Sequence, residues 1–277
     1  MEKITIIHEP TSEKPFLVIN KPKGLASAPL SPDDKNNALA QALELYPQIK
    51  NVKGRKEIEY GLLHRLDTVT DGLLLIATNQ AAYDFLQKEQ REGRFIKTYQ
   101  ALCDYDKTAK IPDGFPPAPD FIPQIGKTFT VSSYFRYFGK SNKEVRPVTK
   151  DSGKKALEKV GKLKEYTTEI FIKDQIGKNF LVECSIKEGF KHQVRCHLAW
   201  CGLPIVNDPV YGYGNGGYCN GKSQNPDCDS DCDYARDCKN ILDKKNAEKV
   251  IKFSATKILF EYPKGDLNSY EITFTWT

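Results

Sequence analysis

The sequence predicts an α+β fold, with a mixed, mostly antiparallel sheet and flanking helices. Two observations support this prediction. The expected strands follow one another as hairpins, and few helical segments separate them. The length of 277 residues allows one large domain or two small ones, and it can bury a large core without disulfides. We expect residues 1–277 to form a single domain.

Two strands and a helix are expected first. Residues 4–8 and 16–20 read as short strands, and the second ends at residues 21–24, where proline removes a backbone donor and glycine allows a turn. A one-sided apolar stripe over residues 38–46 predicts a helix. Pro47 should end this helix, because proline interrupts the helical hydrogen bonds.

A loop, a strand, a helix and another strand should follow. Residues 68–72 are polar and predict a loop in front of the apolar strand 73–77. Residues 79–91 predict a helix, because the asparagine that begins this segment is a suitable N-cap. Residues 95–102 predict the next strand.

The second half of the chain begins with a predicted hairpin. Residues 166–173 and 179–186 alternate polar and apolar side chains, which is typical of an antiparallel pair. They lead directly into a predicted helix over residues 191–201, which Gly202 should end.

The last predicted element is a hairpin of residues 250–262 and 269–276. Two other stretches are predicted to be insertions or loops. Residues 105–128 carry many prolines and little periodicity, and residues 212–240 are rich in Gly, Asn, Asp and Cys.

Composition limits the class of protein. The chain has 41 basic and 36 acidic residues, and the net charge of +5 permits a nucleic-acid partner without requiring one. Only eight of the basic residues are arginine, so an arginine among apolar residues is informative. The longest strongly apolar run, residues 73–77, is too short to cross a membrane, and the N-terminus has no secretory cleavage site. We expect a cytoplasmic protein without a membrane partner, whose eight cysteines form no disulfide framework.

Two motifs in the late loop have weak support. Residues 216–223 match the pattern of a phosphate-binding loop, but the neighbouring residues predict neither the strand before it nor the helix after it. We therefore expect no nucleotide cofactor. Cys219, Cys228, Cys232 and Cys238 could supply thiolates to a metal, but their spacing is irregular. A solvated insertion is the default interpretation, and no metal is assigned.

Several polar residues lie where a side chain could meet a ligand. Asp67 lies in a polar turn between apolar segments, Tyr99 shares one face of its strand with Lys97, and Arg195 lies on an otherwise apolar helix. Singly, each has an ordinary structural explanation, such as turn capping for the aspartate.

The motifs around these residues match one family together. Residues 64–75 read HRLDTVTDGLLL, and residues 97–102 read KTYQAL. Residues 16–25, 189–198 and 202–212 read FLVINKPKGL, GFKHQVRCHL and GLPIVNDPVYG. Taken in their order along the chain, from residue 16 to residue 212, these segments resemble the motifs of the RluA-type RNA pseudouridine synthases, whose signature is HRLDxxTSGLLL.

This resemblance implies the pseudouridine synthase fold with a central active-site cleft, and an isomerase that converts specific uridines of ribosomal RNA or tRNA to pseudouridine without a cofactor. The partner would be RNA, and we expect a monomer. Two alternatives remain open: a non-catalytic RNA-binding or ribosome-assembly protein on the same fold, and a glycoside hydrolase. The hydrolase would need a second acid, for which Glu59 and Asp71 are weak candidates.

The resemblance also implies residue roles. Asp67 would be the catalytic nucleophile or base, Arg195 the cation that keeps it ionised, and Tyr99 the ring that stacks on the target base and removes its C5 proton. Arg65 would hold the flipped-out nucleotide. The residues expected to contact RNA are Lys21, His64, Arg65, Lys97, His192 and Gln193.

The chain departs from the family pattern at several positions. Asp71 stands where serine is usual, Phe190 where arginine is usual, and Ser254 where histidine is usual. The second change removes a possible phosphate contact. Lys21 lies so close to the N-terminus that we expect no separate N-terminal RNA-binding domain, and RNA binding would then depend on the catalytic domain itself.

Overall fold

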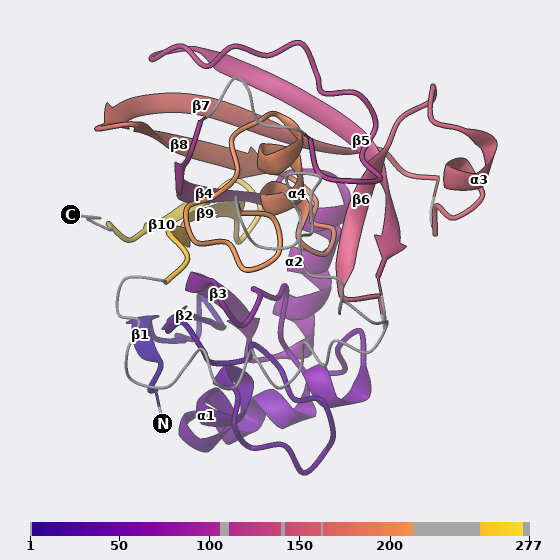
Figure 1. Cartoon of the computed structure of the whole chain (residues 1–277). Coiled ribbons are helices and arrows are strands. Elements are labelled where there is room, and N and C mark those ends of the chain that lie inside the picture. The colour runs from indigo at the N-terminus through magenta and orange to yellow at the C-terminus, as the bar shows by residue number, and fades with distance from the viewer. Residues whose placement is uncertain (1, 106–110, 140–141, 162, 213–249, 274–277) are drawn as a thin grey trace.

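The computed structural model describes residues 2–105, 111–139, 142–161, 163–212 and 250–273. Ten strands of these residues form one sheet in the order β1-β2-β3-β9-β4-β8-β7-β5-β6, with β10 paired to β9 (Figure 1). The strands are β1 (Thr5–His8), β2 (Phe16–Lys21), β3 (Asp71–Ala77), β4 (Ile96–Cys103), β5 (Thr128–Phe138), β6 (Glu144–Val148), β7 (Tyr166–Ile176), β8 (Asn179–Ile186), β9 (Phe253–Glu261) and β10 (Leu267–Glu271). The helices are α1 (Ala38–Leu45), α2 (Gln80–Arg91), α3 (Lys154–Leu157) and α4 (Gln193–Trp200), with 3₁₀ turns η1 (Pro47–Asn51) and η2 (Glu57–Glu59).

The predicted fold class is confirmed. Among the pairings of these ten strands, β3 with β9 is parallel and every other pair is antiparallel. The predicted pair in the second half of the chain is β7 with β8, and the predicted final hairpin is β9 with β10. Asn79 caps α2 as expected, because its side-chain oxygen accepts a hydrogen bond from the Ala82 amide at 2.8 Å.

The β3–β9 junction joins the two halves of the sheet. The half with β1 to β3 and α1 lies on one side of it in Figure 1, and the half with β4 to β8 and α4 lies on the other. The junction consists of the pairs Asp71 with Ser254 and Gly72 with Ala255. Gly72 has φ +125°, and a β-carbon there would lie 2.2 Å from the Ala255 carbonyl oxygen. Only glycine fits this close approach of β3 to β9. The loop that carries Asp67 leads directly into this junction, so it lies where the two halves of the sheet meet.

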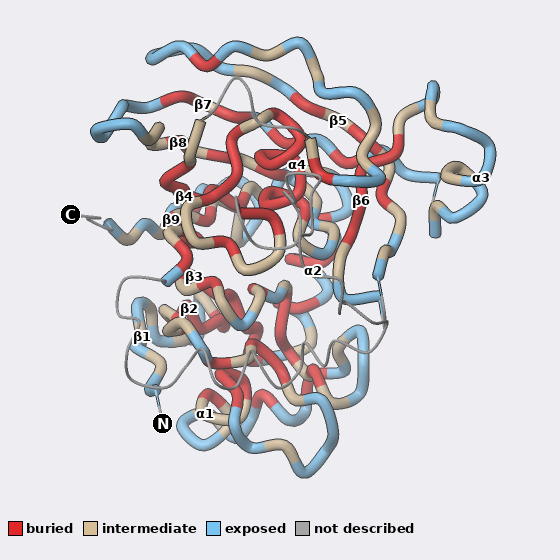
Figure 2. Tube along the Cα trace, viewed as in Figure 1, coloured by how far each residue is buried: buried red, intermediate tan, exposed pale blue. Residues whose placement is uncertain are grey.

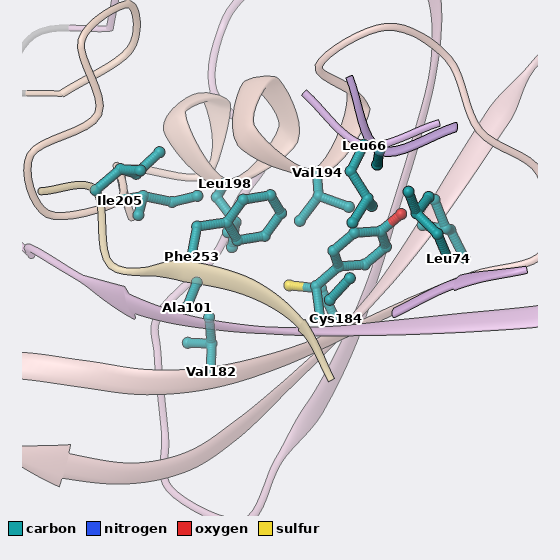
Figure 3. Close-up of a cluster of buried hydrophobic side chains, with 14 of the residues drawn as sticks. Leu66, Leu74, Ala101, Val182, Cys184, Val194, Leu198, Ile205 and Phe253 are labelled. Atoms are coloured by element: carbon teal, nitrogen blue, oxygen red, sulfur yellow. The ribbon is translucent and has the colours of Figure 1, made fainter. Parts of the chain in front are cut away.

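The core extends across this junction. Buried residues run through the centre of both halves in Figure 2. Figure 3 shows Leu66 from the loop before β3, Val194 from α4 and Phe253 from β9 within one cluster. Every residue of α4 is buried, so this helix is held rigidly inside the structure. The core thus fixes α4 relative to the loop before β3.

The sequence analysis missed the hairpin of β5 and β6 and the short helix α3. β5 buries every second residue in its middle, but one of them is Ser133, whose hydroxyl lies 2.9 Å from the Nε2 atom of His197. A buried hydroxyl with a hydrogen-bond partner interrupts the apolar alternation that strand prediction relies on.

The predicted loops are described only in part. Within residues 105–128, the described residues before β5 form no helix or strand. The Trp200 indole nitrogen donates to the carbonyl oxygens of Pro116 and Pro117, which attaches this stretch to α4. The four cysteines of residues 212–240 and the phosphate-loop pattern at 216–223 lie outside the described residues, as does the end of the predicted final hairpin. None of the described helices has the length and apolar content that crossing a membrane requires.

Candidate active site

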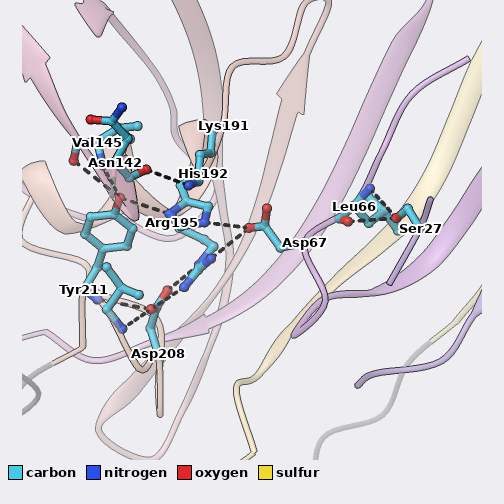
Figure 4. Close-up of polar contacts among 11 residues, drawn as sticks. Ser27, Leu66, Asp67, Asn142, Val145, Lys191, His192, Arg195, Asp208 and Tyr211 are labelled. Carbon is cyan, nitrogen blue, oxygen red and sulfur yellow. Dashed lines mark hydrogen bonds and ion pairs between the residues drawn. The ribbon is translucent and has the colours of Figure 1, made fainter. Parts of the chain in front are cut away.

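The backbone around Asp67 is held on both sides. The Ser27 hydroxyl donates to the Leu66 carbonyl oxygen at 2.8 Å and accepts from the Leu66 amide at 2.9 Å (Figure 4). The Thr70 amide donates to the Asp67 carbonyl oxygen at 3.0 Å, which closes a turn. The Asp67 side chain is 28% exposed, so its carboxylate is fixed in position and still reachable from outside.

Arg195 projects from α4 and binds two carboxylates. Its Nη1 atom donates to the Asp67 Oδ2 atom at 2.8 Å. Its Nε and Nη2 atoms donate to the two oxygens of Asp208, each at 2.8 Å. Because Asp208 occupies one side of the planar group bidentately, the remaining donor is aimed at Asp67. The structure thus brings together two predicted residues that are 128 positions apart in the chain.

Asp208 is a residue that the sequence analysis did not single out. It is fully buried, and its Oδ1 atom also accepts hydrogen bonds from the amides of Val210 at 2.8 Å and Tyr211 at 3.1 Å. An acid in the otherwise mostly apolar segment 203–211 was the available signal, because a buried carboxylate needs a cation. Asp208 compensates the charge of Arg195, so Asp67 is not needed for that purpose alone.

The charges keep Asp67 ionised. Burial raises the pKa of Asp67, whereas the charges of Arg195 and His192 lower it. The combined effect of the charges is larger, so the pKa of Asp67 lies below its usual 3.8. Burial lowers the pKa of His192 to about 4, with Arg195 acting in the same direction and Asp67 against it. At neutral pH the site therefore holds an anionic Asp67 beside a neutral His192.

His192 lies next to Asp67 at the N-terminal end of α4. Its Nε2 atom is 3.8 Å from the Asp67 Oδ2 atom, and its Nδ1 atom is 3.2 Å from the Tyr211 hydroxyl. Tyr211 is fully buried, and its hydroxyl accepts from the Val145 amide at 3.0 Å. The contact of Nδ1 with Tyr211 thus fixes the orientation of the His192 ring, and Nε2 on the other side of the ring faces Asp67.

Tyr99 lies on β4, and the negative charge of Asp67 acts on its hydroxyl. Its ring stacks on the Phe253 ring, with centroids 5.2 Å apart and planes 13° apart. Burial, and to a smaller extent Asp67, raises the pKa of Tyr99 above its usual 10. The phenol is therefore protonated at neutral pH, and one face of its ring is already occupied.

Two of the residues expected to contact RNA are buried and bind the protein itself. Lys21 is fully buried, and its Nζ atom donates to the carbonyl oxygens of Pro22 and Leu25 at 2.9 and 2.8 Å. Burial lowers its pKa to about 8, although Asp71 and Asp67 oppose this shift. Gln193 is 2% exposed and donates to the Thr167 carbonyl oxygen at 2.9 Å. Lys21 holds the turn after β2, and Gln193 ties α4 to β7.

His64, Arg65 and Lys97 have different surroundings. Lys97 is 7% exposed and lies 5.7 Å from the centre of the Phe95 ring. Burial and the charge of Lys97 lower the pKa of His64 to about 3, and both ring nitrogens of His64 are buried without a partner among the described residues. The Arg65 side chain is 58% exposed and lies 3.2 Å from Glu59. Arg65 alone of these three extends to the surface beside Asp67.

The residues that depart from the family pattern each have partners inside the fold. The Ser254 hydroxyl donates to the Asp71 Oδ1 atom at 2.6 Å, and Lys23 lies 3.4 Å from the same oxygen. Two of the unusual residues therefore contact each other across the β3–β9 junction. Phe190 stacks on the Phe135 ring at 5.0 Å with planes 6° apart, so this position holds an aromatic ring where a cation is usual.

We expect Asp71→Asn to lower the free energy of unfolding by about 1–2 kcal/mol. The amide oxygen would still accept from Ser254, but the mostly buried ammonium of Lys23 would lose its only anionic partner among the described residues. Urea unfolding at pH 7 measures the change. Asp266→Asn is the matched control, because its pair with Lys14 is solvent-exposed and should contribute little. Equal losses in the two variants would contradict this interpretation of Asp71.

Comparison with known proteins finds similarity to RNA pseudouridine synthases. A family profile described as RNA pseudouridylate synthase matches residues 15–200. An uncharacterized RNA pseudouridine synthase of Chloroflexus aurantiacus is 31% identical over 70% of the chain and 51% of its own length. Ribosomal large subunit pseudouridine synthase D of Borreliella burgdorferi is 28% identical over 76% of the chain and 55% of its own length. The chain thus spans about half the length of these curated relatives.

Solved structures agree on the fold. Human RNA pseudouridylate synthase domain containing 1 superposes with a TM-score of 0.57 at 16% identity, covering 99% of this chain and 84% of that protein. Human RNA pseudouridylate synthase domain containing 4 superposes with a TM-score of 0.57 at 20% identity, covering 98% and 88%. At these identities the likeness shows a shared fold.

Proposed function

The chain belongs to the RNA pseudouridylate synthase family, and from this we propose that it isomerises specific uridines of ribosomal RNA to pseudouridine. The observation that carries the proposal is the 2.8 Å contact between Arg195 and a partly exposed Asp67. Relatives named for the large ribosomal subunit favour ribosomal RNA over tRNA as the substrate.

The reaction is an isomerisation, so it needs no co-reactant. The C1′–N1 bond of uridine breaks, the base turns, and C5 joins C1′, while the C5 proton leaves and N1 gains one. An ionised carboxylate beside the ribose can start this in two ways. Asp67 would either attack C1′ and form a covalent bond or remove a ribose proton and give a glycal.

Arg195 would act on the substrate chiefly through Asp67. It keeps the carboxylate ionised in a partly buried place and holds it in one orientation. Asp208 in turn fixes the guanidinium, and Tyr211 fixes His192. The site is therefore organised before substrate arrives, which is what a positioned catalytic group requires.

Tyr99 and Arg65 would handle the target nucleotide. The Tyr99 residue is 7% exposed and its ring stacks on Phe253, so the uracil would meet the small part of the ring that stays accessible. Its hydroxyl is protonated, so it is a donor before it can act as the base for the C5 proton. Arg65 is exposed beside the Asp67 loop and can hold the extruded nucleotide by a phosphate contact. Lys21 and Gln193 would support the site from inside the fold.

The alternatives differ in the site they need. A glycoside hydrolase requires a second acid, and both candidates are engaged: Glu59 with Arg65 and Lys56, and Asp71 with Lys23 and Ser254. A non-catalytic RNA-binding protein would not require an ionised carboxylate in an accessible place. The expectation of a cytoplasmic monomer stays a prediction, which sedimentation and cell fractionation would check.

Release of tritium from RNA labelled at uridine C5 tests the proposal. Unmodified ribosomal RNA should lose tritium to water when the chain is added, because only isomerisation exchanges that position among the three candidates. A tRNA pool labelled in the same way tests the other substrate class. Binding of RNA without tritium release would contradict the proposed activity and favour the non-catalytic alternative.

A further inference from the structure

We propose that a hollow between α2 and the segment before η2 binds a phosphodiester of the substrate RNA, outside the target nucleotide. The residues that line this hollow are Gly54, Arg55, Tyr83, Asp84, Gln87 and Arg91, and its volume is about 430 Å³. The inference rests on the proposed function for the identity of its ligand, and it adds a binding site that lies outside the catalytic residues.

The local backbone builds this hollow. Tyr83, Gln87 and Arg91 lie four residues apart on α2, so they project from one face of the helix. Arg55 comes from the opposite wall, in the segment between η1 and η2. Gly54 allows this segment to fold back closely on itself, because a β-carbon there would lie 2.0 Å from the Tyr60 carbonyl oxygen.

The hollow offers more hydrogen-bond donors than acceptors. Gln87 is 8% exposed, and its Nε2 atom is buried with no hydrogen-bond partner among the described residues. Its Oε1 atom accepts a long hydrogen bond of 3.4 Å from Arg55. Arg91 forms no ion pair with any carboxylate in the described part of the chain. Asp84 also lines the hollow and accepts a hydrogen bond from Gln80 at 2.9 Å. Its single negative charge leaves the two arginines in excess.

An unpartnered buried amide is costly unless a ligand or solvent accepts from it. An acceptor-rich anion placed between Arg55 and Arg91 could take the Gln87 amide hydrogen if that side chain shifts slightly. Arginine suits this use, because its planar fork binds phosphate oxygens in pairs. Two of only eight arginines in a lysine-rich chain meet at this hollow, which favours a phosphate over a generally basic surface.

The hollow is electrostatically linked to the active-site loop. Burial lowers the pKa of Lys97 to about 8, and the charge of Arg55 acts on it in the same direction, so Arg55 lies near Lys97. Lys97 in turn acts on His64, which begins the loop that carries Asp67. Arg55 therefore lies near the strand and loop that lead to Asp67, and Arg55 and Arg91 are the cations that an RNA backbone would meet in the hollow.

The double variant Arg55→Gln/Arg91→Gln tests this inference. We expect its dissociation constant for unmodified ribosomal RNA to rise by about 10-fold or more at moderate salt, and the slope of log Kd against log salt to fall by about 1–2. The turnover number at saturating RNA, measured by tritium release, should change less than about twofold. A matched Lys154→Gln/Lys155→Gln variant removes two exposed charges from α3, which lies far from α2 in Figure 1.

The result that overturns the inference is an unchanged affinity in the arginine variant, or an equal loss in the α3 variant, which would show an effect of net charge only. Circular dichroism and urea unfolding check that both variants fold. If the wild-type chain releases no tritium from any RNA, the proposed function fails, and the binding comparison still decides whether the hollow takes a phosphodiester.

Discussion

Asp67→Asn should reduce uridine isomerisation by at least about a thousandfold, since the reaction would lose its ionised carboxylate. The amide oxygen can still accept from Arg195, whose charge Asp208 continues to compensate. The fold should therefore persist, and RNA affinity should be nearly unchanged. Tritium release gives the turnover, and filter binding gives the affinity.

Asp151→Asn provides the control for this prediction. It makes the same chemical change at an exposed position between β6 and α3, outside the proposed binding sites, so it should leave turnover nearly unaltered. Turnover of Asp67→Asn equal to that of the wild type would remove Asp67 from the chemistry. Loss of both turnover and folding would instead show that its contact with Arg195 is needed for structure.

The second large effect is expected for Arg195→Lys. Three nitrogen atoms of Arg195 donate to two carboxylates, and a single ammonium cannot reproduce this geometry. We expect turnover to fall by about a hundredfold or more. The free energy of unfolding should fall by about 1–3 kcal/mol, because the ammonium keeps the charge but cannot replace all three charged hydrogen bonds.

The pH profile separates the two roles of Arg195. Arg195 opposes the effect of burial and lowers the pKa of Asp67, so a weaker cation should let that pKa rise. The acidic limb of the rate profile should then move to higher pH in Arg195→Lys, because the carboxylate becomes protonated sooner as the pH falls. Near-normal turnover with an unmoved acidic limb would contradict the assigned pairing.

Much of the fold could be predicted because its elements have local signals. Period-two and helical patterns, an asparagine cap and a proline stop define β2, α1, α2 and β7 with β8. The hairpin of β5 and β6 escaped prediction because its buried positions include Ser133 and Arg146, which are satisfied by partners distant in sequence. Sequence patterns do not reveal such partners.

In the candidate site, too, the residue types could be predicted from local motifs, whereas their contacts depend on the fold. Asp67, Tyr99 and Arg195 could be proposed from motifs, but their spatial relationship comes from the β3–β9 junction and from the burial of α4. The sequence analysis did not single out Asp208, because its importance depends on which cation it meets. Lys21 was expected to contact RNA, yet its ammonium faces backbone carbonyls inside the fold.

Mapping of pseudouridines in ribosomal RNA from cells that lack this chain tests the central claim most directly. The account predicts that defined uridines remain unmodified, that the wild-type chain restores them as pseudouridine, and that Asp67→Asn, expressed at the same level, does not. Restoration by Asp67→Asn, or RNA with the same modifications whether or not the chain is present, would contradict it.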